Sequence, residues 1–308
     1  MAIERIVVVR RMTALEELID KFQTKAQAKF YLQQAGQSFE RVEQEHRTFQ
    51  HALADVHRAI PKSMKHHTID RSLLSDYRFN PDDLILTLGP DGLLVNVAKY
   101  LRGQPIIAVN PDPATVDGIL LPTAVSQVAT QIHAVKNGSA QLKHLTMAKV
   151  ETDDGQQLLA LNDFFVGAKT HVSARYRLAQ GSVSERHSSS GIIVSTGVGS
   201  TGWMRSIYEG ALRAGTGFGI PMSQSDYRPL PWDAQALLFA VREPFPSKQT
   251  QTELTFGQLG PGEQLVIESE MASNGVIFSD GVEADSLDFH AGRTATISIA
   301  EHSAVLTA

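Results

Sequence analysis

The sequence predicts an α/β domain at the N-terminus and a β-rich second domain after it. Short apolar runs alternate with helical stretches over the first 110 or so residues, which indicates parallel strands joined by crossover helices. Beyond Pro122 the pattern changes to many brief strands with little helix between them. The hydrophobic fraction of 42% and charged fraction of 20% are typical of a globular protein with a well-buried core.

The first domain is expected to contain three buried strands with helices between them. Ile, Val and Leu dominate the apolar runs, whereas Leu, Ala, Gln, Glu and Lys fill the stretches without glycine or proline. Pro61 marks the end of the second helical stretch. We expect strands at 6–9, 83–88 and 106–110, helical stretches at 13–34, about 37–59 and 93–101, and a tight turn at 89–92.

The second domain is expected to hold mostly strands, with one embedded helix. Alternating segments such as His171-Val-Ser-Ala-Arg-Tyr-Arg-Leu suit strands with one face in water. The stretch 215–231, rich in glycine, proline and serine, is expected to form an ordered loop. We expect a short helix at about 124–135, strands at 142–151, 157–161, 163–167, 170–179, 191–196, 236–242, 263–269, 274–279 and 294–300, and the embedded helix at 200 to about 214.

Charge and composition exclude several classes of protein. The net charge of −5 argues against a nucleic-acid partner, since such proteins usually carry a basic excess. The absence of cysteine excludes disulfides and thiolate chemistry. No apolar run has the length of a signal peptide or of a membrane span, so no membrane partner and a cytoplasmic location are expected.

The first candidate site is Leu88-Gly89-Pro90-Asp91-Gly92-Leu93, which follows the second predicted strand. Ligands of open α/β sheets bind at the carboxyl ends of strands, and glycines let a phosphate approach the backbone at a helix N-terminus. A carboxylate at Asp91 is placed to accept a proton from an attacking hydroxyl in phosphoryl transfer. The alternative is structural, because Asp-Gly is a common turn pair and Asp a common helix cap.

The second candidate site is the loop that follows the run Gly191-Ile-Ile-Val. Its glycines and hydroxyls suit a phosphate or ribose at a helix N-terminus. It also spells G-x-G-x-x-G, but no strand ending in an acid follows about 20 residues later, as a dinucleotide fingerprint requires. A glycine-rich turn capped by Ser200 is the structural alternative. The side chains and glycines that we single out are Ser195, Thr196, Gly197, Gly199, Ser200, Thr201 and Gly202.

Two polar turns and the histidines complete the candidates. Asn162-Asp163 has an amide and a carboxylate that suit a ribose or an adenine edge, although Asn-Asp between strands is more often a hairpin turn. Ser279-Asp280-Gly281 has the composition of a hairpin turn as well. The eleven histidines show no spacing that gathers ligands on one face, so no protein metal site is expected.

In their order along the chain these motifs resemble those of the NAD kinase family, particularly its mitochondrial branch. The family's Gly-Gly-Asp-Gly-Thr is similar to residues 89–93, its Asn-Glu pair to Asn162-Asp163, and its glycine-rich segment to residues 195–202. Val109-Asn-Pro-Asp-Pro is similar to the branch's Val-Asn-Thr-Asp-Pro, and the Arg242-Glu-Pro segment has a counterpart there too. The resemblance spans about residues 5–300.

The resemblance implies a fold, a reaction and a set of site residues. It implies an α/β nucleotide-binding domain at 1–122 with a C-terminal segment from about 286 to 308 returning to it, and a sandwich-like NAD-binding domain at 123–285. It implies ATP with Mg²⁺ as phosphoryl donor, NAD as acceptor substrate, and a homodimer or higher homo-oligomer. Asp91 would be the base on the ribose 2′-hydroxyl, and Gly89 and Gly92 would face phosphates. The substrate-binding positions are Asn110, Asn162, Asp163, Ser195, Thr196, Gly199, Ser200, Thr201 and Ser206.

Departures from the family pattern leave other functions open. Pro90 replaces a glycine and removes an N–H donor, Leu93 replaces a threonine, and Asp163 is one methylene shorter than the family's glutamate. Ser190 and Trp203 differ from the common branch as the mitochondrial branch does. A nucleotide-binding homologue with weak or no activity and a kinase acting on a sugar, lipid or nucleoside alcohol are therefore the alternatives.

Overall fold

The computed structural model describes residues 3–221 and 227–308. The chain divides into two compact units, Met1–Lys143 with Val305–Ala308, and His144–Ala304. The first unit is a parallel sheet with helices, and the second consists mainly of antiparallel strands. The fold class expected from the sequence is thereby confirmed. Among the described residues, no helix has both the length and the apolar character needed to cross a membrane.

The first unit is built on a seven-stranded sheet with the order β2-β1-β3-β4-β19-β6, in which β5 also pairs with β4. The strands β1 and β3 are neighbours and parallel, as are β3 and β4. Both β3 and β4 are buried along their whole length, which explains their continuous apolar sequences. The strand bounds are Arg5–Arg10 (β1), Lys65–Asp70 (β2), Asp83–Leu88 (β3), Pro105–Asn110 (β4), Thr123–Ala124 (β5), Leu142–Leu145 (β6) and Ala304–Thr307 (β19).

Local capping sets where the helices of the first unit begin. The hydroxyl oxygens of Thr13, Thr24 and Ser38 each accept a hydrogen bond from the first turn of the helix that follows. The carboxylate of Glu16 accepts a hydrogen bond from the backbone N–H of Thr13 and completes a capping box. The helix bounds are Ala14–Phe22 (α1), Lys25–Gln34 (α2), Phe39–Ala59 (α3), Asp91–Ala98 (α4) and Val128–Lys136 (α5), with single 3₁₀ turns at Arg71–Leu73 and Val125–Gln127.

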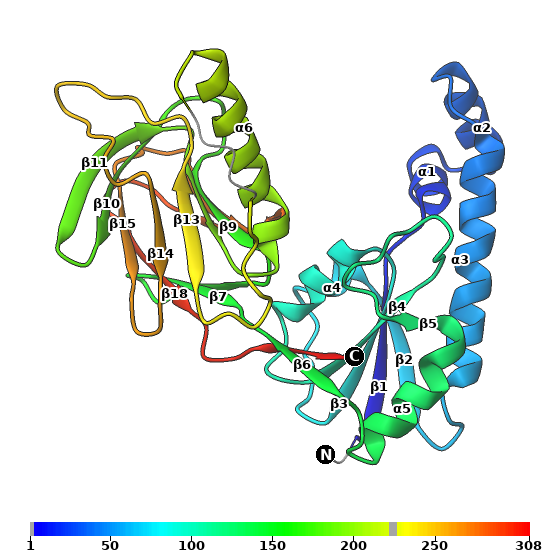
Figure 1. Ribbon diagram of the computed structural model, residues 1–308. Helices are drawn as coiled ribbons and strands as arrows, with labels where there is room; N and C mark the ends of the chain where they lie inside the picture. Colours follow the sequence, from blue (N-terminus) through cyan, green and yellow to red (C-terminus); the bar gives the residue numbers. More distant parts are fainter. Residues whose placement is uncertain (1–2, 222–226) are drawn as a thin grey trace. The chain divides into compact units, whose positions relative to one another are not determined.

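The long helix α3 and the shorter α5 cover one face of the parallel sheet (Figure 1). Phe49, Ala52 and Val56 lie on one stripe of α3, three or four residues apart, and pack against alternate side chains of β1, β3 and β4. Val128 and Ile132 of α5 complete this core and are fully buried. Because β1, β3 and β4 are parallel, their carboxyl ends lie at one edge of the sheet.

The second unit is a sandwich of two six-stranded antiparallel sheets. One sheet has the order β11-β10-β15-β18-β7-β8, and the other has the order β14-β13-β12-β9-β16-β17. The bounds are Ala148–Thr152 (β7), Gln157–Ala160 (β8), Asp163–Ala168 (β9), Ala174–Gln180 (β10), Val183–Ser189 (β11), Ile192–Ser195 (β12), Leu237–Val241 (β13), Phe256–Leu259 (β14), Leu265–Ser269 (β15), Gly275–Ser279 (β16), Val282–Asp288 (β17) and Thr294–Ile299 (β18).

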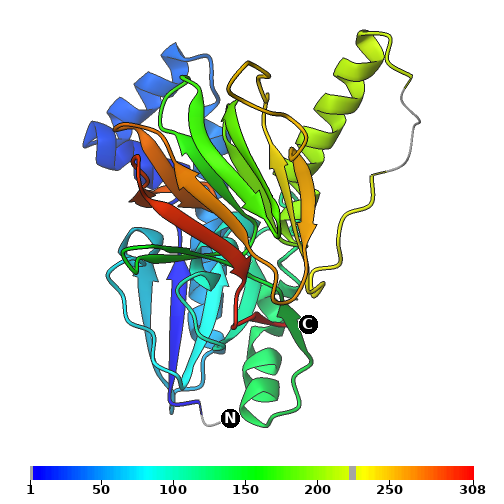
Figure 2. The same ribbon diagram turned by 90° about the vertical axis from the view of Figure 1, so that its left-hand side faces the viewer.

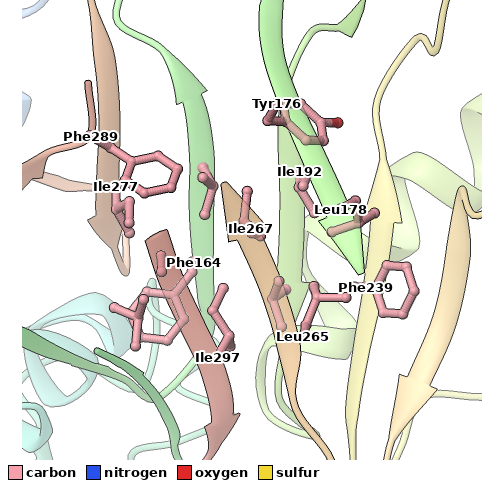
Figure 3. Close-up of a cluster of buried hydrophobic side chains, with 14 of the residues drawn as sticks. Phe164, Tyr176, Leu178, Ile192, Phe239, Leu265, Ile267, Ile277, Phe289 and Ile297 are labelled. Atoms are coloured by element: carbon pink, nitrogen blue, oxygen red, sulfur yellow. The ribbon is translucent and has the colours of Figure 1, made fainter. Parts of the chain in front are cut away.

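The two sheets enclose a single large apolar core (Figure 3). Phe164, Tyr176, Phe239 and Phe289 are its largest side chains, and each is fully buried. Helix α6 (Trp203–Gly217) packs on the outer face of the second sheet, where Met204 contacts a smaller cluster around Ile193. Trp203 and Ile207 of this helix also pack against the cluster, and the C-terminal end of the helix projects away from the strands (Figure 2).

Several element boundaries differ from those expected. The helical block at 13–34 is two helices, because Gln23 adopts a left-handed conformation (φ 66°) and Thr24 caps a new helix. The strand expected at 142–151 is two strands, β6 and β7, and α4 begins at Asp91 rather than at 93. The embedded helix runs from 203 to 217 after a 3₁₀ turn at Gly199–Thr201. Part of the loop expected at 215–231, residues 222–226, lies outside the described residues.

The sequence analysis does not anticipate β2, β11, β14, β17 or β19. The first four lie at the edges of their sheets and carry many polar residues, so the apolar signal of a strand is weak. β19 has only four residues and joins the first sheet beside β4. The compact units also divide differently from the expected domains, at 143/144 rather than 122/123, because α5 packs on the first sheet. Of the C-terminal segment expected at about 286–308, only residues 305–308 belong to the first unit, because β18 pairs with β7 and β15 in the second unit.

Candidate functional site

The carboxyl ends of β1, β3 and β4 lie at one edge of the parallel sheet, and the turn that contains Asp91 is at this edge. In the strand order β2-β1-β3-β4 the chain runs from β1 to β2 on one side, and the next strand, β3, lies on the other side of β1. A topological switch point therefore lies between β1 and β3. Ligands of open α/β sheets bind outside such a point. Gly89, Pro90 and Asp91 follow β3 there, and Arg11 follows β1.

The carboxylate of Asp91 is held by one of its two oxygens. Oδ1 accepts a hydrogen bond from the backbone N–H of Leu120 at 2.8 Å. Oδ2 makes no hydrogen bond with the residues that the structure describes, and the side chain is partly exposed. Asp91 is the first residue of α4, and the cap position belongs to Pro90, which makes no side-chain cap. Asp91 is therefore oriented by a distant loop and does not serve as an ordinary helix cap.

The same loop is fastened to Asn110 at the end of β4. The Asn110 side chain donates to the carbonyl oxygen of Val116 at 3.0 Å and accepts from the N–H of Asp112 at 3.0 Å. Asn110 is 5% exposed, so both ends of its amide are committed to the protein. Gly118 approaches this amide so closely that an added Cβ would lie 2.5 Å from Nδ2. Asn110 thus positions the loop that orients Asp91, rather than facing open space.

The turn before α4 has the shape of a phosphate loop with fewer donors. Pro90 carries no N–H, and the N–H of Leu93 is already bonded to the carbonyl of Pro90 at 2.8 Å. The Leu93 side chain is 1% exposed and packs against Gly89. Nothing lies within 4 Å of a Cβ added at Gly92, which is exposed. The backbone at Gly92 is consequently open to a ligand.

A cavity of about 410 Å³ lies beside this turn, within the first unit. Its lining comes from the chain after β1, from one face of α3, from Gly89 and Pro90, and from the loop after β4. The volume falls in the range of about 300–1,000 Å³ that is usual for small-molecule sites. None of its lining residues except Gly89 is among the predicted site residues.

In the second unit the Asn162–Asp163 corner is bound by Asp280. The carboxylate of Asp280 accepts hydrogen bonds from the backbone N–H groups of Leu161, Asn162 and Asp163 at 3.0, 2.7 and 3.3 Å. Asp280 lies in the β16–β17 hairpin turn with φ 56°, followed by Gly281 with φ 68°. The expected hairpin at 279–281 is therefore confirmed.

The corner itself is not a hairpin, since β8 and β9 belong to different sheets. The side chains of Asn162 and Asp163 make no hydrogen bond with the described residues, and Asp163 is 8% exposed. Burial, followed by the nearby charge of Asp280, raises the pKa of the Asp163 carboxyl to about 7. A carboxyl with this pKa can either donate or accept a hydrogen bond near neutral pH.

The hydroxyl-rich loop after β12 packs tightly against this corner. The N–H of Thr196 donates to the carbonyl of Asn162 at 2.9 Å, and its hydroxyl donates to the carbonyl of Leu161. A Cβ added at Gly199 would lie 2.1 Å from the carbonyl oxygen of Asn162. The Ser200 hydroxyl donates to the carbonyl of Gly197 at 2.7 Å. The close approach at Gly199 and the hydrogen bonds of Thr196 hold the loop against the Asn162–Asp163 corner.

The predicted site residues of the second unit thus divide into two groups. The side chains of Ser195, Thr196 and Ser200 are fully buried and bond to backbone atoms of the loop or its neighbours. Thr201 and Ser206 are exposed at the start of α6, although each hydroxyl also donates to a nearby backbone carbonyl. The sequence offered no sign of Asp280 as the group that holds the corner, because its hairpin is distant in sequence.

The structure excludes a Rossmann dinucleotide site at the glycine-rich loop after β12. β12 pairs antiparallel with β9 and β13, so the G-x-G-x-x-G sequence does not connect a parallel strand to its crossover helix. That context is what a Rossmann dinucleotide site requires. Within the described ranges 3–221 and 227–308, no group of three or more His, Asp or Glu side chains gathers as a metal site.

Comparison with solved structures finds proteins that match this chain over nearly its whole length. No protein-family model matches the sequence, and no curated protein matches it. The yeast NADH kinase in complex with NADH matches with a TM-score of 0.63 at 13% identity, over 99% of this chain and 83% of that chain. An NAD kinase from Archaeoglobus fulgidus in complex with ATP matches with a TM-score of 0.58 at 16% identity, over 99% and 93%. The chain therefore has the fold of the NAD kinases.

Proposed function

We propose that this protein is a kinase that transfers the γ-phosphate of ATP to the 2′-hydroxyl of the adenosine ribose of NAD, giving NADP. The observation that carries the proposal is the carboxylate of Asp91 at the switch point of the parallel sheet. One of its oxygens is fixed by Leu120 and the other is left for a ligand. The fold of the NAD kinases supports the choice of substrates.

In this mechanism Asp91 acts as the general base. Its Oδ2 accepts the proton of the ribose hydroxyl while the hydroxyl oxygen attacks the γ-phosphorus and the bond to the β-phosphate oxygen breaks. The hydrogen bond from Leu120 keeps the carboxylate in one rotamer, so little orientation must be gained on the way to the transition state. Asn110 contributes indirectly, because it fixes the loop that carries Leu120.

The phosphates of the donor are assigned to the exposed backbone at Gly92, beside the N-terminus of α4. Mg²⁺ at kinase sites is bound largely by the nucleotide's phosphates with one or two carboxylates. We therefore assign Mg²⁺ to the ATP complex that enters as substrate. The carboxylate of Asp91 belongs to the phosphate turn itself.

We assign the acceptor's adenosine to the Asn162–Asp163 corner of the second unit. The amide of Asn162 and the carboxyl of Asp163 make no hydrogen bonds with the described residues, so both have capacity for a base edge or ribose hydroxyl. The exposed hydroxyls of Thr201 and Ser206 are the further contacts that we propose. The buried hydroxyls of Ser195, Thr196 and Ser200 are assigned to holding the loop, with Gly199 allowing its close approach.

One observation favours a second candidate, a nucleotide-binding protein with little or no turnover. Pro90 and Leu93 remove an N–H and a hydroxyl from the phosphate turn, and Leu93 is buried against Gly89. Each lost donor to a charged group costs about 1.5–3 kcal/mol if nothing replaces it. Two such losses in the transition state lower the rate by about 10²- to 10⁴-fold.

The test is formation of NADP from NAD, ATP and Mg²⁺, read with an NADP-specific dehydrogenase. We expect turnover by the unchanged protein and a loss of about 10²-fold or more in Asp91→Asn, because the amide cannot accept the proton. The amide oxygen can still accept the hydrogen bond from Leu120, so the fold is preserved. Asp117→Asn, an exposed aspartate in the same loop, is the matched control and should keep full activity.

Other results would favour the alternatives. Calorimetric binding of ATP and NAD without NADP formation would support the non-catalytic candidate. Phosphorylation of a different alcohol from radiolabelled ATP, with NAD inert, would keep the base but change the acceptor. Undiminished NADP formation by Asp91→Asn would remove Asp91 from the mechanism. The homo-oligomer that belongs to this proposal is tested separately by light scattering after gel filtration.

A further inference from the structure

We propose that a groove between α6 and the end of β13 binds a small organic carboxylate with an apolar body, of the fatty-acid class. The groove belongs to the second unit and has a volume of about 470 Å³. One face of α6 forms one wall, and the last residue of β13 with the Arg242-Glu-Pro segment after it forms the other. The proposed kinase reaction gives this segment no role, and the inference does not depend on that reaction.

The guanidinium group of Arg242 is the polar anchor of the groove. Its side chain makes no hydrogen bond with the residues that the structure describes, and it is 29% exposed. Its Nη2 lies 3.7 Å from Oε2 of Glu243, which is too long for a hydrogen bond. The five N–H donors of the guanidinium are therefore available to an anion, and their planar arrangement matches the two oxygens of a carboxylate.

Neighbouring residues hold Arg242 in position. The central carbon of its guanidinium lies 5.5 Å from the centre of the Trp203 ring, which is nearly parallel to the ring of Phe165 at 6.0 Å. The backbone N–H of Arg242 donates to the carbonyl of Gly191, and its carbonyl accepts from the N–H of Ser190, both at 2.8 Å. The anchor is thus already placed, which lowers the ordering cost that a ligand must overcome.

The backbone at Glu243 has an unusual conformation. Its φ of 43° lies in the left-handed region, which is uncommon for a residue other than glycine, and the following Pro244 restricts it further. Strain of this kind persists where the surrounding structure imposes it, often at binding sites. The Glu243 side chain is 67% exposed, and exposed ion pairs are weak. Its carboxylate can move into water, so that a ligand's carboxylate takes its place beside Arg242.

The remainder of the groove suits an apolar chain. Ile207 and Val241 line its inner part, whereas Gly210 and Ala214 give the wall of α6 no side chain larger than a methyl group. The lining of α6 runs from Trp203 to Ala214, which is about 16 Å at the rise of an α-helix. An elongated groove with one cationic anchor fits an alkyl chain that ends in an acid.

The charge of the lining favours a carboxylate over a phosphate. Among the described residues that line the groove, only Arg242 and Glu243 are ionisable. One guanidinium balances the single charge of a carboxylate, whereas phosphate groups are usually recognised by clusters of arginines. The head group gives orientation and the chain gives most of the affinity, since each buried methylene strengthens binding about fourfold.

The test is calorimetry on the full chain with octanoate, with acetate and with 1-octanol. With four methylenes buried, octanoate should bind about 10²-fold more tightly than acetate. Arg242→Gln should weaken octanoate by about tenfold or more and leave octanol unchanged, because only the acid uses the charge. Arg213→Gln, at an exposed arginine of α6 outside the groove, is the matched control and should change neither. Glu243→Gln should strengthen octanoate, because it removes the competing carboxylate.

A second pair of variants tests the chain's position. Ala211→Phe fills the groove from an exposed position and should weaken both octanoate and octanol, whereas Ala272→Phe, at an exposed alanine outside it, should weaken neither. Thermal unfolding followed by circular dichroism checks that each variant folds. If Arg242→Gln does not fold, the response of octanoate to Glu243→Gln and Ala211→Phe decides the matter.

Several results would overturn the proposal. Equal effects of Arg242→Gln and Arg213→Gln, or the absence of octanoate binding, would show that the groove has no anionic ligand of this class. Ser206 lines the groove and is also a proposed acceptor contact. Loss of octanoate binding in saturating NAD would therefore assign the groove to the acceptor site. Dissociation of an oligomer by octanoate, measured by light scattering, would assign it to a second copy of the chain. A failure to form NADP would end the kinase proposal and leave these measurements unaffected.

Discussion

The buried carboxyl of Asp163 should make the protein less stable at alkaline pH, and its replacement by asparagine should remove that penalty. The pKa of this carboxyl rises from its ordinary value of 3.8 to about 7, through burial and the neighbouring Asp280. The folded state therefore holds a proton that the unfolded state releases. Its contribution to stability is complete below the unfolded pKa and is lost as the pH rises through about 7.

The difference of roughly three pKa units corresponds to about 4 kcal/mol at a pH above both values. Asparagine stays neutral at every pH, but its amide places new donors in the same buried position, which costs about 1–3 kcal/mol if they stay unpaired. We therefore expect Asp163→Asn to gain about 1–3 kcal/mol relative to the unchanged protein at about pH 8, and no gain at about pH 5.

Urea unfolding followed by tryptophan fluorescence is the assay. Both tryptophans, Trp203 and Trp232, lie in the second unit, so the signal reports the unit that contains Asp163. Asp233→Asn, at an exposed aspartate of the same unit, is the control and should show no such dependence on pH. A free-energy difference between Asp163→Asn and the unchanged protein that is the same at both pH values would refute the reasoning.

Two further substitutions test the packing that positions the sites. Gly197→Ala should destabilise the second unit by about 1–3 kcal/mol, because its Cβ would lie 1.9 Å from the carbonyl oxygen of Pro231. Gly210→Ala on α6 is the control and should be neutral or slightly stabilising, because nothing lies within 4 Å of its Cβ. Equal urea midpoints for the two variants would contradict this prediction. Arg5→Ala should destabilise the first unit by about 3–5 kcal/mol, because it strands the carboxylate of Asp83, which is 1% exposed and bound by Arg5 through both oxygens. Thermal unfolding followed by circular dichroism measures the second effect, and a loss below about 1 kcal/mol would mean that the ion pair is dispensable.

The proposed site depends on contacts between distant parts of the chain. Asp91 is oriented by Leu120, which is 29 positions away, and the Asn162–Asp163 corner is held by Asp280, more than a hundred positions away. The sequence around Leu120 or Asp280 does not indicate these contacts. Nearly every residue has a backbone N–H like that of Leu120, and the Ser279-Asp280-Gly281 sequence indicates only a turn. Candidate site residues could thus be proposed from motifs, but the long-range contacts that position them could not.

The sequence by itself determined the buried strands β1, β3 and β4 of the first unit with helical stretches between them, the β-rich character of the second unit and the place of the Asp91 turn at a strand end. These features follow from local patterns: continuous apolar runs, turn residues and helix caps act over a few neighbouring positions. Only the tertiary structure decided that the hydroxyls of Thr196 and Ser200 bond inward, that Asp163 is buried beside Asp280, and that a cavity adjoins the phosphate turn. Burial and long-range hydrogen bonds depend on which segments meet in the fold, and that information is spread over the whole chain.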